Sequence, residues 1–154
     1  MKIVRLSSRP DLIPEIVKHL HAEWSAFTNW SNPEKIRQRF LKRSQPETGE
    51  TCFVALGDEK KLLGTASVLQ HEIKEIREGT HWMSEVYTCP DARGKGIGTA
   101  LIEKCVDYCR AQNFKDIYLY TPDQQALYRK HGWRAVKSIE YDGEQVSIMK
   151  RTLA

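Results

Sequence analysis

The 154-residue sequence lacks several features that would place it in a specialised class of protein. Its apolar runs are only a few residues long, whereas a helix that crosses a bilayer needs about 20. No apolar segment follows the charged start of the chain, so we expect no secretory signal. No two cysteines have the C-x-x-C spacing typical of zinc sites, and without a signal a disulfide framework is not expected. We therefore expect a cytoplasmic protein with reduced thiols and no metal.

The sequence also has little excess of charge of one sign. It contains 24 lysines and arginines against 20 aspartates and glutamates, a formal net charge of +4. Charges of both signs are spread along the chain, and this small excess does not predict a nucleic-acid partner. No repeat, low-complexity run or linker divides the sequence, and its length suits one domain. We expect residues 1–154 to form a single domain with no membrane or nucleic-acid partner.

The hydrophobic pattern predicts a mixed α/β fold. An Asn-Pro pair at 32–33 is typical of a helix start, and Asp142-Gly143 is a strong β-hairpin signal. Pro90 and Pro122 end two predicted strands. Residues 44–50 predict a loop. The predicted strands are 2–6, 51–56, 62–70, 81–88, 116–121, 133–140 and 144–151, and the predicted helices are 10–24, 33–43, 97–113 and 123–132.

A glycine-rich turn joins the strand that ends at Thr88 to the long helix that follows. Gly94, Gly96 and Gly98 alternate along this turn, so several backbone amides are left uncovered where the helix begins. Such amides, with the positive end of the helix dipole, form an anion site suited to a pyrophosphate. The spacing does not fit a Walker A loop and fits a dinucleotide fingerprint poorly. A turn that binds no ligand remains the alternative.

The motif Arg93-x-x-Gly96-x-Gly98 resembles the (Arg/Gln)-x-x-Gly-x-(Gly/Ala) motif of the GNAT superfamily of acyl-CoA-dependent N-acyltransferases. Residues 127–133, Leu-Tyr-Arg-Lys-His-Gly-Trp, resemble the closing signature of that family. The predicted order of elements matches nearly the whole chain. The resemblance implies an α/β fold with a mixed, mostly antiparallel central sheet, splayed central strands and helices on both faces.

The resemblance also implies acetyl-CoA as the acetyl donor. In this superfamily the preceding strand holds the pantetheine and the acetyl oxygen, which here points to Val86 and Thr88. Many relatives have an asparagine seven residues before the signature tyrosine, where this chain has Thr121. We expect Gln124 or Gln125 to replace that contact. The turn residues implied to bind the CoA pyrophosphate are Arg93, Gly94, Lys95, Gly96, Gly98 and Thr99.

Two side chains are candidates for catalysis. Tyr128 matches the tyrosine that protonates the departing thiolate, and its alternative role is that of a core tyrosine beside Trp133. Glu85 lies on the expected splayed strand, where the family often carries an acidic residue. Since a lysine-like amine has a pKa of about 10.4, a carboxylate there could accept its proton or position it. The alternative for Glu85 is a solvated or salt-bridged carboxylate.

Three further residues are weaker candidates for contact with the acceptor: Glu23, Trp24 and Glu72. The two glutamates are also weaker candidates for accepting the amine proton. The second predicted helix is strongly basic over residues 34–43, which suits either a solvated face or the docking of an acidic partner.

The function predicted from these observations is transfer of an acetyl group from acetyl-CoA to a primary amine. The amine would attack the thioester directly in a ternary complex. The acceptor could be a small molecule or an amine of a peptide or protein, and a homodimer is an expected assembly because dimers are frequent in the superfamily. The alternatives are a catalytically inactive acyl-CoA-binding sensor and an interaction module that uses the basic helix.

Overall fold

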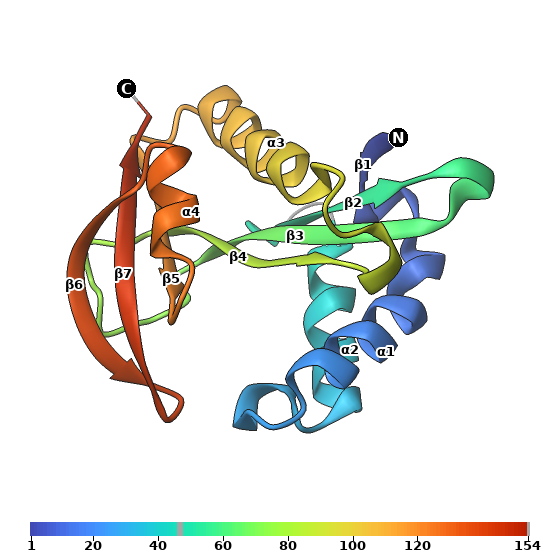
Figure 1. The fold of residues 1–154 in the computed structure, drawn as a ribbon, viewed down its shortest axis with the longest axis horizontal. Helices are drawn as coiled ribbons and strands as arrows, with labels where there is room; N and C mark the ends of the chain where they lie inside the picture. The colour runs from blue at the N-terminus through green and yellow to red at the C-terminus, as the bar shows by residue number, and fades with distance from the viewer. Residues whose placement is uncertain (46–47, 154) are drawn as a thin grey trace.

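A seven-stranded sheet in the order β1-β2-β3-β4-β5-β7-β6 runs through the computed structural model of the chain, which describes residues 1–45 and 48–153 (Figure 1). The predicted order of strands and helices is confirmed. Pro46 and Glu47 of the predicted loop, and Ala154, lie outside the described residues. The strands are β1 (Lys2–Arg5), β2 (Thr51–Leu56), β3 (Leu62–Gln70), β4 (His81–Thr88), β5 (Asp116–Thr121), β6 (Arg134–Tyr141) and β7 (Glu144–Thr152), and the helices are α1 (Ile13–Trp24), α2 (Pro33–Arg43), α3 (Ile97–Ala111) and α4 (Gln125–Lys130).

The helix ends follow local signals in the sequence. The side chain of Asn32 accepts hydrogen bonds from the amides of Glu34 and Lys35 at 3.0 and 3.3 Å, which starts α2 where the Asn-Pro pair predicts it. Asn113 follows α3 with a φ of 62°, the left-handed conformation that ends many helices. The first predicted helix begins three residues late, because residues 10–12 form a 3-10 turn before α1.

Helices cover both faces of the sheet, as the resemblance implies. Side chains of β2 alternate between the two layers: Cys52 and Val54 pack with α1 and α2, whereas Phe53 and Ala55 pack with α3. Tyr128 of α4 packs against the same cluster as α3. Since both faces of β2 are covered, all its residues are buried. No helix within the described ranges is long and apolar enough to cross a membrane.

The sheet opens between β4 and β5, its one parallel pair of neighbouring strands. Trp82 and Tyr118 are the only aligned pair between β4 and β5, whereas β5 pairs with β7 along its whole length. Both residues are buried in a small apolar cluster that lies at this junction. Beyond them the two strands diverge, which confirms the expected splay (Figure 1).

β4 also carries a bulge where it diverges from β5. Its register with β3 shifts between Thr65 and Ser67, so that Glu85 and Val86 both lie opposite Ala66. Glu85 has a φ of 57°, a conformation that costs a residue with a Cβ about 1–2 kcal/mol. The bulge therefore needs support from its surroundings.

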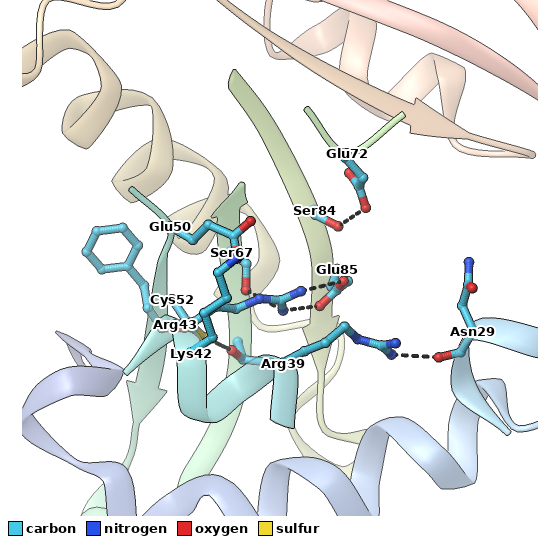
Figure 2. A network of polar contacts seen from close by, with 12 residues as sticks. Asn29, Arg39, Lys42, Arg43, Glu50, Cys52, Ser67, Glu72, Ser84 and Glu85 are labelled. Atoms are coloured by element: carbon cyan, nitrogen blue, oxygen red, sulfur yellow. Dashed lines mark hydrogen bonds and ion pairs between the residues drawn. The ribbon is translucent and has the colours of Figure 1, made fainter. Parts of the chain in front are cut away.

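Arg43, the last residue of α2, provides that support. Its two terminal nitrogens donate to both carboxylate oxygens of Glu85, with 3.1 Å between Nη2 and Oε2, and Nη1 also donates to Ser67 Oγ at 3.2 Å (Figure 2). The side chain of Arg43 is 3% exposed and that of Glu85 is 10% exposed. A bidentate pair that is this well buried depends on both partners, because removing one leaves a buried charge without compensation.

We expect Arg43→Met to lower the free energy of unfolding by about 3–5 kcal/mol, the usual cost of breaking a buried ion pair. Combining it with Glu85→Gln should recover most of the loss, because the isolated carboxylate is then gone. Urea denaturation of the single and double variants measures both effects.

Arg37→Met is the matched control on the same helix. Arg37 pairs with Glu34 at 2.7 Å, but the two side chains are 43% and 62% exposed. An exposed pair contributes about 1 kcal/mol at most, so this variant should unfold close to the wild-type midpoint. Equal losses of unfolding free energy in Arg43→Met and Arg37→Met would contradict the role given to Arg43.

Candidate active site

A cavity of about 440 Å³ lies where β4 and β5 diverge. One wall is formed by β4 residues from Met83 to Val86, and another by β5 residues from Leu119 to Thr121. The end of α1, the segment that follows it, and the hairpin between β6 and β7 complete the lining. The cavity brings together seven of the residues predicted from the sequence: Glu23, Trp24, Glu72, Glu85, Val86, Gln124 and Tyr128.

The lining of the cavity is acidic. No lysine or arginine is found among the described residues that line it. Arg43, which does not line the cavity, neutralises the charge of Glu85. Among the described residues, the other carboxyl groups of the lining have no buried cationic partner of this kind. Such a lining favours a cationic ligand. The acidic residues in the lining are Glu23, Glu72, Glu85, Asp123, Asp142 and Glu144.

Aromatic rings form much of the remaining lining. Trp24 and Trp30 lie with their ring centroids 4.9 Å apart, and Tyr120 and Tyr141 with theirs 5.0 Å apart. The first pair comes from α1 and the segment after it, the second from β5 and β6. Aromatic faces attract ammonium groups by cation–π interaction, which adds to the attraction of the carboxylates.

Tyr128 lines the cavity from α4. Its ring packs edge-on against Trp133, with 5.9 Å between centroids. Tyr128 therefore packs in the core beside Trp133 and also lines the cavity. Burial is the main cause that raises the pKa of Tyr128 to about 12. The hydroxyl therefore keeps its proton at neutral pH and is able to donate it.

Glu72 lies in the segment between β3 and β4 and lines the cavity beside Ser84. Ser84 Oγ donates to Glu72 Oε2 at 2.6 Å (Figure 2). Oε1 of Glu72 is buried and has no hydrogen-bond partner among the described residues. Burial, and next the negative charge of Glu85, raise the pKa of Glu72 to about 8. This carboxyl group thus titrates near neutral pH, unlike an ordinary glutamate.

The glycine-rich turn lies directly before α3. Gly94 and Gly96 have φ values of 77° and 81°, and a Cβ built on either would meet nothing within 4 Å. The glycines are thus needed for the backbone conformation rather than for space. The first amides of the 15-residue helix α3 have no partner within the helix, and its first turn holds no acidic residue. The turn therefore has the geometry of an anion site.

The side chain of Arg93 is engaged within the protein. Its Nε donates to the carbonyl oxygen of Thr88 at 3.0 Å, and its Nη2 forms an ion pair with Glu23 at 2.9 Å. Glu23 lines the cavity, but its carboxylate already has this partner. Arg93 therefore links the glycine-rich turn to α1. Lys95 lies elsewhere, in the lining of a second cavity of about 270 Å³.

The two glutamines considered as substitutes for the missing asparagine lie differently. Gln125 uses its side-chain nitrogen within the protein, donating to Ser147 Oγ at 3.1 Å and to the carbonyl of Pro122 at 3.2 Å. Gln124 is exposed and lines the cavity. Of the two, Gln124 is placed for contact with a ligand.

The basic side chains of α2 point largely to partners inside the protein. Arg39 lies over the ring of Trp30 at 4.7 Å and thereby supports an aromatic wall of the cavity. This explains most of the positive charge over residues 34–43 without an external partner. Arg37 pairs with Glu34 on the same helix, and Lys42 pairs with Glu50. Figure 2 shows the contacts of Arg39 with the carbonyl of Asn29 and of Arg43 with Glu85.

The sequence does not indicate that Arg43 and Asp142 belong to the site. Arg43 carried only the signal of a basic helix, and nothing in its neighbourhood indicates Glu85, 42 positions away. Asp142 belongs to the predicted hairpin, but the sequence does not say that this hairpin faces the end of α1. Its Oδ2 accepts from the amide of Asn29 at 3.5 Å. Within the described residues, no group of three or more potential ligands is arranged to hold a metal.

Two examples show that solved acetyltransferase structures share this fold. One is an aminoglycoside 6'-N-acetyltransferase complexed with coenzyme A, which is 16% identical, covers 100% of this chain and 98% of its own, and superimposes with a TM-score of 0.76. The other is a mutant of spermidine N-acetyltransferase SpeG from Vibrio cholerae, 19% identical, covering 99% of this chain and 95% of its own, with a TM-score of 0.74.

Sequence comparison gives a short match to a curated protein and a long match to a family. Over 44 residues the chain is 48% identical to the uncharacterised protein YxbD of Bacillus subtilis (strain 168), which is 26% of this chain and only 28% of that protein. Residues 14–133, most of the chain, match the acetyltransferase (GNAT) family. The family match includes the glycine-rich turn, both strands that diverge, and Tyr128. The chain therefore belongs to the GNAT family of acetyltransferases.

Proposed function

We propose that the protein transfers the acetyl group of acetyl-CoA to a primary amine of a cationic small molecule. The observation that carries this proposal is the cavity between the diverging strands, whose lining is rich in carboxylates and aromatic rings and holds no lysine or arginine among its described residues. A site of this kind attracts an ammonium group at the point where the family places the acetyl thioester.

The glycine-rich turn fits the donor. Gly94 and Gly96 leave open space above the backbone, and the free amides at the start of α3 suit the negative charge of a pyrophosphate. The other turn residues assigned to this role, Arg93, Lys95, Gly98 and Thr99, act chiefly through their backbone amides. Acetyl-CoA supplies an acetyl group activated as a thioester.

The diverging strands fit the pantetheine arm. Past Trp82, the β4 edge that faces β5 has no aligned strand partner, so backbone groups there can bind a ligand, apart from the carbonyl of Thr88, which accepts from Arg93. Val86 and Thr88 are the residues assigned to this contact. An amide here would stabilise the oxyanion that develops on the acetyl carbonyl, an effect worth about 3–4 kcal/mol in other enzymes.

The reaction proceeds by direct attack in a ternary complex. The amine nitrogen, once deprotonated, bonds to the acetyl carbon, and the carbon–sulfur bond then breaks. Tyr128 gives its hydroxyl proton to the departing sulfur and regains one from the nitrogen as the amide forms. With a pKa of about 12, this hydroxyl is protonated at neutral pH, so the proton to be donated is in place.

The charge of the cavity favours acceptors with more than one ammonium group. Solved relatives with the same fold are an aminoglycoside acetyltransferase and a spermidine acetyltransferase, both of which act on small amines. The position of Asp123, Asp142 and Glu144 in the lining gives a second ammonium group carboxylates to contact.

Release of free thiol from acetyl-CoA across a panel of amines tests the proposal. We expect turnover with spermidine, putrescine or an aminoglycoside, and at least tenfold lower kcat/KM for a neutral amino acid or an acidic peptide with a free N-terminus. Preference for the acidic peptide would contradict the cationic acceptor. Binding of CoA without turnover of any amine would favour an acyl-CoA sensor instead.

Tyr128→Phe should lower kcat by about 100-fold, since the departing thiolate loses its proton donor. The affinity for CoA should stay within about twofold, because the ring and its packing against Trp133 remain. Tyr108→Phe, which removes a hydroxyl on α3 outside the cavity lining, should have wild-type kcat. A Tyr128→Phe enzyme with normal kcat would refute the donor role.

Gly96→Ala should weaken CoA binding by about tenfold, because alanine resists the left-handed conformation that the turn needs, at a cost of about 1–2 kcal/mol. Gly143→Ala is the matched control: it has a φ of 80° and equally open space, but lies in the β6–β7 hairpin. Calorimetric titration with CoA should show near wild-type affinity for this control. Equal affinities in both variants would argue against the turn as the pyrophosphate site.

A further inference from the structure

We propose that Glu72 is the catalytic residue that accepts the proton of the acceptor amine, and that Glu85 is a positioning residue that acts through the β4 bulge. The proposal rests on the acetyltransferase function proposed above and assigns the proton step of that same site. It is drawn from the different partners of the two carboxyl groups, both of which line the cavity.

Glu85 is poorly placed to accept a proton. Both of its oxygens accept hydrogen bonds from the terminal nitrogens of Arg43, and the side chain is 10% exposed (Figure 2). Protonating this carboxylate would leave the buried guanidinium without its counter-charge, at a high energetic cost. Its position in the bulge, with a φ of 57°, instead suits a role in shaping β4 where the strand leaves β5.

Glu72 has a free acceptor atom. Its Oε2 accepts from Ser84 Oγ at 2.6 Å, but Oε1 is buried with no hydrogen-bond partner among the described residues. A buried polar atom without a partner costs free energy unless a ligand or proton meets it. Because Glu72 lines the cavity, an amine bound there lies next to this carboxyl group.

The surroundings of Glu72 also adjust its basicity. A glutamate with an ordinary pKa is a weak base toward an amine with a pKa of about 10.4, and raising its pKa narrows that gap. Burial is the largest cause of the raised pKa of Glu72, about 8, and the charge of Glu85 comes next, while Ser84 and Arg43 lower it. The groups that interact with Glu72 are Ser84 and Glu85 from β4, Arg39 and Arg43 from α2, Glu50 before β2, Tyr120 from β5 and Tyr141 from β6.

The proton balance is complete within the site. Ionised Glu72 takes one proton from the substrate ammonium, which leaves a neutral amine with a free electron pair. The nitrogen attacks the acetyl carbon, the carbon–sulfur bond breaks, and the sulfur takes its proton from Tyr128. The second proton on nitrogen restores Tyr128, and Glu72 releases its proton to solvent after the acetamide leaves.

Glu72→Gln tests the assignment with an isosteric side chain that keeps a contact to Ser84. We expect kcat to fall by about 100-fold, with the KM for acetyl-CoA unchanged. In wild type, log kcat/KM should have an ascending limb near pH 8. The variant should lose this limb, and its kcat/KM should rise only as the pH approaches the pKa of the amine. Deprotonation of the free amine affects wild type and variants equally. Glu78→Gln, an exposed carboxyl group in the same segment, should match wild type.

Two variants that keep Glu72 should shift the pH of the ascending limb in opposite directions. Ser84→Ala deletes the hydrogen bond that lowers the pKa of Glu72, so the limb should shift to higher pH. Glu85→Gln deletes the negative charge that raises this pKa and leaves Arg43 in place, so the limb should shift to lower pH. If Glu85 were the proton acceptor, its replacement would abolish the limb instead.

Stability gives a readout that needs no substrate. The pKa of Glu72 is about 8 when folded, against an ordinary value near 4.5, so the folded state holds a proton that the unfolded state has lost between these pH values. The free energy of unfolding of wild type should therefore fall, relative to Glu72→Gln, as pH rises from about 4.5 to 8. Equal pH dependence in the two proteins would contradict the raised basicity.

The results separate this proposal from the function on which it rests. Wild-type kcat and an unchanged limb in Glu72→Gln, with an active wild type, would overturn the role of Glu72 and leave the acetyltransferase function standing. A wild-type protein that releases no thiol with any amine of the panel would overturn the function itself, and the proton step with it.

Discussion

The site depends on one buried ion pair. Arg43 reaches from α2 through the layer to Glu85 and holds a β4 residue in a backbone conformation that it would not adopt alone. The bulge at Glu85 comes three residues after Trp82, where β4 forms its aligned pair with β5. The same interaction thus joins the helical layer to the sheet and fixes the strand that forms one wall of the cavity. The pair also fixes the position of the Glu85 carboxylate. Both oxygens of Glu85 are bonded to Arg43, while the negative charge of Glu85 raises the pKa of Glu72.

Much of the fold was predictable because its signals are local. Asn32 caps α2, Asn113 follows α3 in the left-handed conformation, and Asp142-Gly143 forms the β6–β7 hairpin, each from a few neighbouring residues. The layer that each side chain of β2 meets is not visible in the sequence, because all residues of this strand are buried. The splay of the central strands came from the family resemblance, since no local pattern indicates that β4 and β5 share a single aligned pair.

The site was predictable only in part. The glycine-rich turn and Tyr128 lie in short motifs, so the sequence indicated both. The proton acceptor depends instead on which carboxyl group meets a buried cation, and Arg43, Glu72 and Glu85 come from three separate segments. Residues of equal charge on a basic helix look alike in sequence, although Arg37 is exposed and Arg43 is buried. Contacts with residues far away in the sequence determine which of these arginines is buried.

The glycine-rich turn and the cavity present different chemical groups: the turn presents backbone amides and the cavity presents side chains. The turn before α3 offers backbone amides and glycine conformation, whereas the cavity between β4 and β5 is lined by side chains, many of them at the end of α1, between β3 and β4, and at the tip of the β6–β7 hairpin. Substitutions in those connecting segments change the charge and shape of the cavity without breaking a ladder of the sheet. A chain of this fold can therefore drift to new acceptors while it keeps one donor.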